Sequence, residues 1–154
     1  MIKIMFVCHG NICRSPLAEF LMKELVTKEG QIDNFYICSA ATSTEEIGNP
    51  IYPPIKQILN SNGIDCSQKK AVRVKKSDYY DFDFLICMDK NNLHNLSYII
   101  GSDIDNKVYR LLDFTNNPRD VADPWYTRDF KSCENDIRLG CKAFYDFIIK
   151  SNYF

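Results

Sequence analysis

Short apolar runs along the chain alternate with segments in which apolar residues recur every three or four positions. The strand-like runs cover 2–7, 35–40, 82–88 and 107–112. Helix-like spacing follows the first run at Leu17, Leu21 and Leu25, and a second helical segment covers 51–59 behind a proline. The same spacing over 130–148 predicts one long amphipathic helix near the end of the chain.

Strands that alternate with helices predict an α/β fold, in which helices cover both faces of a parallel sheet. Ligands of such sheets bind beyond the carboxyl ends of the strands. The first strand-like run leads directly into Cys8, so the loop that starts there is the natural place for a site. A length of 154 residues and an ordinary globular composition fit one domain over 1–154.

Charge and cysteine usage narrow the classes of protein. A formal net charge of -1 argues against a nucleic-acid partner. One basic stretch, which we interpret as a solvated edge segment, contains Lys69, Lys70, Arg73, Lys75 and Lys76. The first apolar run is too short for a signal peptide, and no later run is long enough to span a bilayer. Seven cysteines without a repeated spacing indicate reduced thiols, so we expect a cytoplasmic monomer with no membrane partner.

The loop from Cys8 to Arg14 has the features of an oxyanion site. A nucleophilic cysteine must be a thiolate, which requires positive potential nearby. Arg14 supplies a permanent charge, while Ser15 as N-cap and Pro16 at the first helical position would point the amino end of a helix at the loop. Backbone N–H groups of the loop could then form a nest for a phosphate, with Gly10 able to adopt positive φ.

Other interpretations of this loop are a buried structural cysteine beside a surface arginine, a Walker-type loop or a zinc site. The order strand, Gly-Asn loop and Ser-Pro helix start favours phosphate binding over the first of these. No Gly-Lys-Ser/Thr ending is present, which excludes the Walker type. Cys8, Cys13 and His9 have no second ligand pair with suitable spacing, so we expect no metal.

Residues 7–16, VCHGNICRSP, resemble the signature loop of the low-molecular-weight protein tyrosine phosphatases. The resemblance continues through 39–43, 63–65, 87–89 and 123–125 in the family's order. It implies a four-stranded parallel sheet flanked by helices, the phosphotyrosine phosphatase I-like fold. It also implies hydrolysis of phosphotyrosine in proteins or peptides through a phosphocysteine on Cys8, with Arg14 as phosphate clamp and without any cofactor.

A phosphomonoester leaving group needs a proton, and a carboxyl group on a loop can supply it. The long connection before the last helix offers Asp113, Asp120 and Asp123, and the residues alone do not choose among them. Resemblance selects Asp123 as general acid and base, because Asp-Pro followed by an aromatic matches the family's motif. Trp125 and Tyr126 would then line the rim of the pocket.

The resemblance also implies roles for neighbouring residues. The remaining residues of the phosphate-binding loop are His9, Gly10, Asn11, Ile12, Cys13 and Ser15. Ser15 matches a hydroxyl that stabilises the thiolate, and Asn11 and Ser39 match residues that hold the loop in shape. Cys13 matches a second loop cysteine that traps oxidised Cys8 as a reversible disulfide.

Three positions depart from the family's usual pattern. Lys69 stands where many members have a histidine that supports the loop asparagine, and Val72 stands where arginine is frequent. Glu45 occupies a position at the pocket rim where several members carry an aromatic. A carboxylate there would favour basic neighbours of the phosphotyrosine.

Two other functions are compatible with parts of this pattern. An arsenate reductase of the same fold needs a relay of cysteines, but Cys87 has no partner a few residues on. Cys133 and Cys141 are eight residues apart on a helix, about 12 Å, which is too far for a disulfide. A non-catalytic phosphotyrosine-binding module would need neither a thiolate nor an acid, so Cys8 and Asp123 together argue against it.

Overall fold

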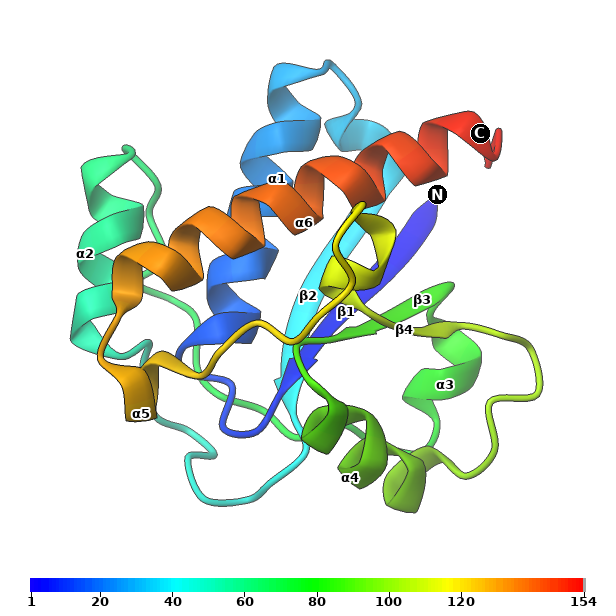
Figure 1. The fold of residues 1–154 in the computed structure, drawn as a ribbon, viewed down its shortest axis with the longest axis horizontal. Coiled ribbons are helices and arrows are strands. Elements are labelled where there is room, and N and C mark those ends of the chain that lie inside the picture. Colours follow the sequence, from blue (N-terminus) through cyan, green and yellow to red (C-terminus); the bar gives the residue numbers. More distant parts are fainter. Residues whose placement is uncertain (154) are drawn as a thin grey trace.

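The computed structural model describes residues 1–153 (Figure 1). Its strands are β1 (Ile2–Cys8), β2 (Phe35–Ala41), β3 (Phe84–Cys87) and β4 (Val108–Arg110). Its α-helices are α1 (Arg14–Lys28), α2 (Pro53–Ser61), α3 (Asp78–Asp81), α4 (Lys90–Ile100), α5 (Pro124–Thr127) and α6 (Phe130–Lys150). Two 3-10 turns are η1 (Ile32–Asn34) and η2 (Leu111–Phe114). Within the described residues, no helix has the length and apolarity needed to cross a bilayer.

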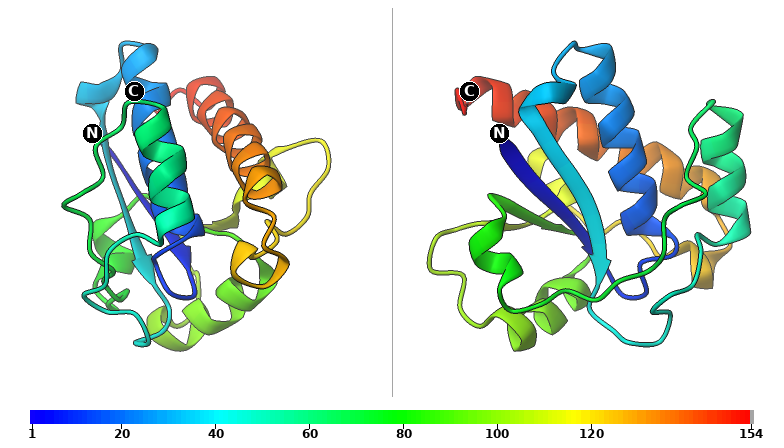
Figure 2. Two further views of the ribbon diagram at one scale, coloured as in Figure 1. Left: turned by 90° about the vertical axis from the view of Figure 1, so that its left-hand side faces the viewer. Right: turned by 180° about the vertical axis from the view of Figure 1, so that it is seen from behind.

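The four strands form one sheet in the order β2-β1-β3-β4, and every pair is parallel. Alternation along β1 divides the core into two layers. Ile4 and Phe6 pack with residues of α1 and α6, whereas Met5 and Val7 pack with residues of α3 and α4. Figure 2 shows α1, α2 and α6 on one side of the sheet and α3 and α4 on the other. The predicted fold class, a parallel sheet with helices on both faces, is confirmed.

Several element boundaries differ from those that the hydrophobic pattern predicts. The fourth strand ends at Arg110, because Leu111 and Leu112 turn into η2 and are buried against α6. The second predicted helix begins at Pro53 instead of 51, with proline in its first turn. The pattern missed α4, whose start is fixed by a capping box between Asp89 and Asn92.

The long final helix is confirmed and packs closely against the loop after β4. Its predicted apolar stripe is buried at Cys133, Ile137, Cys141, Phe144 and Ile148. Gly140 lies on the same helix, and a Cβ added there would approach within 2.5 Å of Leu111 Cγ. Glycine therefore permits the close contact between α6 and η2.

Candidate active site

The loop that follows β1 surrounds the sulfur of Cys8. The backbone N–H of Asn11 donates to Cys8 Sγ over 3.3 Å, and Ser15 Oγ lies 2.9 Å from the same sulfur. Asn11, at φ 59°, is the loop residue in the left-handed region; the expectation that Gly10 would supply positive φ is wrong. Asparagine tolerates this region, and here its side chain is also held by hydrogen bonds.

The Asn11 side chain is the centre of that hydrogen-bond network. Its amide nitrogen donates to Ser15 Oγ over 2.7 Å and to Ser39 Oγ over 3.0 Å. Its amide oxygen accepts from the backbone N–H of Val72 over 3.1 Å. The network spans the first loop, the end of β2 and the segment after Lys70, so it fixes the loop against the sheet.

Ser15 is not the N-cap that the sequence predicts. The helix α1 begins at Arg14, with Cys13 as N-cap, and Ser15 is therefore its second residue. Pro16 is tolerated at the third position because N–H groups of the first turn have no partner within the helix. This start leaves the Ser15 hydroxyl free to face Cys8 and Asn11.

Arg14 is buried, not the surface residue of the alternative interpretation. Its side chain is 3% exposed, and one terminal nitrogen donates to Asp89 Oδ2 over 2.6 Å and to the carbonyl of Val121 over 2.8 Å. The other terminal nitrogen lies 3.4 Å from Asp123 Oδ2. Burial alone would lower the pKa of Arg14, but the nearby Cys8, Asp123 and Asp89 raise it, which keeps the guanidinium charged.

The three candidate aspartates have different surroundings. Asp123 caps α5, accepts from the backbone N–H of Trp125 over 3.0 Å and reaches Arg14. Asp113 and Asp120 instead bind Arg110, over 2.7 and 2.9 Å. Of the three, Asp123 is the one that lines the pocket at Cys8.

A hollow of about 540 Å³, open to solvent, lies above the loop. Its lining residues are Cys8, His9, Gly10, Ile12, Cys13, Arg14, Glu45, Glu46, Asp123, Trp125 and Tyr126. Glu45 Oε2 accepts a hydrogen bond from His9 Nε2 over 3.0 Å at the rim. Tyr126 is 81% exposed, so its ring lies at the surface of the hollow and not in the core.

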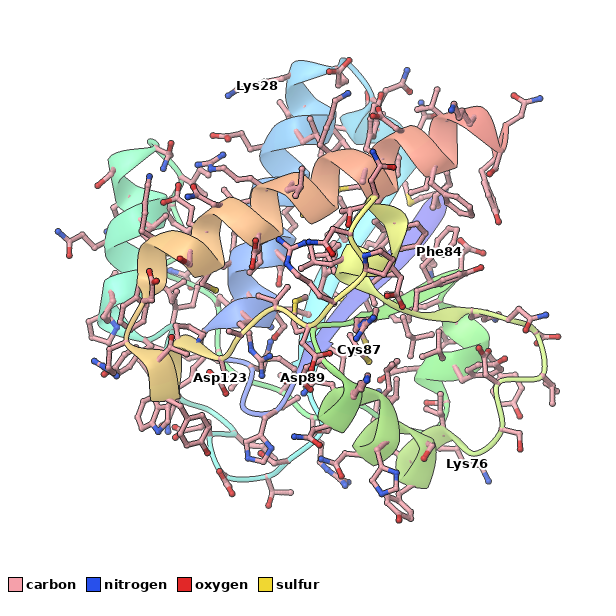
Figure 3. The ribbon with its side chains drawn as sticks, viewed as in Figure 1. Lys28, Lys76, Phe84, Cys87, Asp89 and Asp123 are labelled. Carbon is pink, nitrogen blue, oxygen red and sulfur yellow. The ribbon has the colours of Figure 1, made fainter. Side chains whose placement is uncertain are left out.

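The sequence pattern predicts no role for Asp89, Glu19 or Glu46, which all lie at the site. Asp89 lies two residues after the end of β3, in the segment 87–89 that resembles the family, and with Asp123 it lies near the strand end marked by Cys87 (Figure 3). Its place at the carboxyl end of a parallel strand is the signal that could have identified it. Glu19 and Glu46 had no such signal. Glu19 sits on the buried side of α1 and accepts from Ser39.

Two residues that depart from the family pattern also contribute to the hydrogen bonds that hold the loop. Lys69 donates to the carbonyl of Ser39 over 2.9 Å, so a lysine contacts the residue that supports the loop asparagine. Val72 contributes its backbone N–H to Asn11, and its side chain is half exposed. Loop support from position 72 therefore comes from the backbone.

All seven cysteines are free thiols in the structure. Burial, together with the neighbouring Cys8 and Asp123, raises the pKa of Cys13 well above its ordinary value, with Arg14 opposing the shift. Burial likewise raises the pKa of Cys87. Among residues 1–153 no group of three His, Cys, Asp or Glu side chains is arranged to hold a metal ion.

Comparison with known proteins places this geometry in a family. The model of the family "Low molecular weight phosphotyrosine protein phosphatase" matches residues 3–152. The low molecular weight protein-tyrosine-phosphatase YfkJ of Bacillus subtilis is 37% identical over 144 residues, which cover 92% of each chain. The phosphatase PtpA of Staphylococcus haemolyticus is 34% identical over 97% of this chain and 96% of its own.

Solved structures agree with the sequence comparison. The crystal structure of YfkJ from Bacillus subtilis superposes with a TM-score of 0.94 at 36% identity, covering 99% of this chain and 97% of the other. The phosphatase SP-PTP from Streptococcus pyogenes gives a TM-score of 0.83 at 38% identity, covering 97% and 93%. The match of sequence and fold over nearly the whole length shows that this chain belongs to the low molecular weight phosphotyrosine protein phosphatase family.

Proposed function

We propose that this protein hydrolyses phosphotyrosine in proteins, with Cys8 as nucleophile, Arg14 as phosphate clamp and Asp123 as general acid and base. The observation that carries the proposal is the convergence of all three on one pocket. Cys8 Sγ faces a loop amide and the Ser15 hydroxyl, and the buried Arg14 lies between Asp89 and Asp123. The relatives are named protein-tyrosine-phosphatases, which supports the same activity for this chain.

In the first step the Cys8 thiolate attacks phosphorus, so that a P–S bond forms while the P–O bond to the tyrosine breaks. Asp123 transfers its proton to the departing phenolic oxygen. Arg14 and the backbone N–H groups of the loop stabilise the charge that spreads over the equatorial oxygens. The products of this step are a phosphocysteine and a protein whose tyrosine side chain is dephosphorylated.

In the second step water attacks the phosphocysteine and gives its proton to the Asp123 carboxylate. The P–S bond breaks, phosphate leaves and the Cys8 thiolate returns. Ser15, 2.9 Å from the sulfur, is placed to donate to the thiolate as it leaves. Arg14 holds the phosphoryl oxygens throughout.

The rim of the pocket suits an aromatic phosphoester within a basic peptide. Trp125 and Tyr126 present ring surfaces to the substrate, and Trp125 packs against Tyr52 at 5.0 Å between ring centres. Glu45 and Glu46 place two carboxylates on the lining. We infer a preference for phosphotyrosines with Lys or Arg neighbours.

Arsenate reduction and non-catalytic phosphotyrosine binding are less well supported. The relatives are named phosphatases. Asp123, in reach of Arg14, lies where a leaving group would need its proton, and a binding module has no use for an acid there.

Hydrolysis of a phosphotyrosine peptide by the wild type, Cys8→Ser and Asp123→Asn tests the mechanism. Cys8→Ser should be inactive, and Asp123→Asn should be slower by about 100- to 10,000-fold, the range of general acid catalysis. Asp113→Asn, a loop carboxylate bound to Arg110, is the matched control and should keep the wild-type rate. Equal rates in all four proteins would exclude the mechanism.

We also propose that Cys13 protects Cys8 from irreversible oxidation. Peroxide converts the Cys8 thiolate to a sulfenic acid, and the Cys13 thiol displaces water from it to form a disulfide. Both sulfurs are buried in the same short loop, which supports the pairing. A thiol reductant should restore peroxide-treated wild type but not Cys13→Ser; equal recovery would defeat the idea.

A set of seven free thiols suits a reducing compartment, and on this ground we propose a cytoplasmic location. The matching family and the resemblance imply a phosphoprotein substrate, and we propose that a monomer acts on it. Fractionation of cells and light scattering of the purified protein test the two proposals.

A further inference from the structure

Glu19 is a buried carboxylate that takes no part in the proposed chemistry. It lies on α1 and is 4% exposed. Its Oε1 accepts from the Ser39 hydroxyl over 2.6 Å, and its Oε2 accepts from Lys23 over 2.6 Å. Lys69 lies 3.8 Å from Oε1 and donates to the Ser39 carbonyl as well. A buried charge is costly unless it is paired, so this arrangement of two lysines and a serine needs a reason.

The orientation of the Asn11 amide is fixed by a group that can only donate. The backbone N–H of Val72 points at one atom of the amide, which must therefore be the oxygen. The amide nitrogen consequently faces Ser39 and Ser15, and it donates one N–H to each hydroxyl oxygen.

Each of these two hydroxyls has one proton to donate and is already an acceptor for Asn11. The proton of Ser39 is directed to Glu19, since the ionised carboxylate accepts and does not donate. The proton of Ser15 is directed to the remaining neighbour, Cys8 Sγ, at 2.9 Å. Donated hydrogen bonds thus run outward from the Asn11 amide in two branches, a relay that ends on the Cys8 sulfur at one end and on the buried carboxylate at the other.

We propose that Glu19 and Lys69 are positioning residues, which hold the Ser39 end of this relay and so, together with the Val72 N–H, keep the Asn11 amide in the orientation that commits the Ser15 hydroxyl to donate to the Cys8 thiolate. The proposal rests on the proposed role of Cys8 as nucleophile. Lys69 neutralises Glu19 and also binds the backbone of Ser39, so it supports Asn11 at the position where the resembled family often has histidine. Burial lowers the pKa of Lys69, and Glu19 opposes this shift, as expected for a desolvated ion pair.

The test is the pH dependence of Cys8 alkylation by iodoacetamide, with modification of the Cys8 peptide followed by mass spectrometry. Ionisable groups that interact electrostatically with Cys8 include Arg14, Cys13, Lys69, Cys87 and Cys133. Those that act on Lys69 include Glu19, Cys38, Lys23 and Cys8. The variants Glu19→Gln and Lys69→Met change opposite charges, so simple electrostatics would move the alkylation midpoint in opposite directions.

The relay predicts that both variants move the midpoint upward. Without a committed donor, the fraction of Cys8 present as thiolate should be about tenfold lower at any pH below the midpoint. This equals a rise of the midpoint by about one pH unit. Lys69→Arg should restore the wild-type midpoint. Glu29→Gln, an exposed position at the end of α1, and Lys70→Met, the exposed neighbour of Lys69, are matched controls and should leave it unchanged.

An unchanged or lowered midpoint in Glu19→Gln would overturn the relay. If circular dichroism shows that Glu19→Gln does not fold, Lys69→Met decides alone, and a wild-type midpoint there overturns the proposal. Alkylation does not require turnover. A wild type that fails to hydrolyse phosphotyrosine would therefore refute the proposed function, while the midpoints still report on the relay.

Discussion

Asp89→Asn tests how the buried guanidinium of Arg14 is held. The Asp89 carboxylate uses both of its oxygens. Oδ2 accepts from Arg14 over 2.6 Å, and Oδ1 accepts from the backbone N–H of Asn92 over 2.7 Å at the start of α4. An asparagine has one amide oxygen. If that oxygen keeps the helix cap, the amide nitrogen faces Arg14, and two donors then meet.

The expected loss of activity follows from the hydrogen bonds that Arg14 loses and keeps in this variant. A hydrogen bond to a charged group contributes about 1.5–3 kcal/mol. The side chains of Arg14 and Asp89 are 3% and 16% exposed, so solvent does little to weaken this one. Arg14 keeps its bond to the Val121 carbonyl, and we therefore take about 2 kcal/mol for the loss. At 1.36 kcal/mol per factor of ten, kcat/KM should fall about 30-fold.

The assay is steady-state hydrolysis of an aryl phosphate, with folding checked by thermal denaturation. Asp129→Asn is the control, because Asp129 also caps a helix, α6, by accepting from the N–H of Ser132. Asparagine is as good an N-cap as aspartate, so neither helix should be lost. A kcat/KM within twofold of wild type for Asp89→Asn, or an equal loss in Asp129→Asn, would refute the reasoning.

Three further predictions concern stability and specificity. Gly140→Ala should lower the free energy of unfolding by about 1 kcal/mol in urea denaturation, since overpacking against Leu111 costs about 1–3 kcal/mol and improved helix propensity returns about 1 kcal/mol; a more stable variant would contradict this. Burial raises the pKa of Cys141 to about 12 from 9.0, so the folded chain keeps a proton that the unfolded chain loses at alkaline pH. The free energy of unfolding should then fall between pH 9 and 10.5, by about 1.5 kcal/mol for this thiol, and Cys141→Ala should remove that part of the decline; an unchanged slope would count against it. Replacing Glu45 and Glu46 by glutamine should reduce the kcat/KM ratio of lysine-flanked to glutamate-flanked phosphopeptides by up to about fivefold per charge, and less in high salt; a constant ratio would show that the rim charges do not select substrates.

Much of the fold could be predicted because its longest elements have strong periodic patterns. The strands β1 and β2 and the helix α6 are of this kind, and most of their hydrophobic residues are buried, with Tyr36, Leu139 and Ile149 as exposed exceptions. The helix α4 is rich in asparagine, histidine and serine, which are weak helix formers. It depends on the Asp89 cap, whose meaning appears only when the end of β3 is known.

The residues of the site also divide into those that a local sequence pattern predicts and those that it does not. Cys8 and Arg14 lie at the two ends of one short loop, so the sequence alone indicates that they are close. The contacts of Arg14 with Asp89 and of Asn11 with Ser39 join residues 75 and 28 positions apart, and no local pattern encodes them. The start of α1 differs from the prediction because the Ser15 hydroxyl is engaged with Asn11 and Cys8, and these bonds within the loop outweigh the capping preference of serine.

Both backbone polar groups of Val121 make hydrogen bonds. Its N–H donates to the carbonyl of Met88, and its own carbonyl accepts from Arg14. A hinged closure of the segment that carries Asp123 would break both bonds at once. The segment that carries Asp123 is therefore tied to the body of the protein at Val121, and we expect turnover to be limited by chemical steps and not by the opening and closing of a lid.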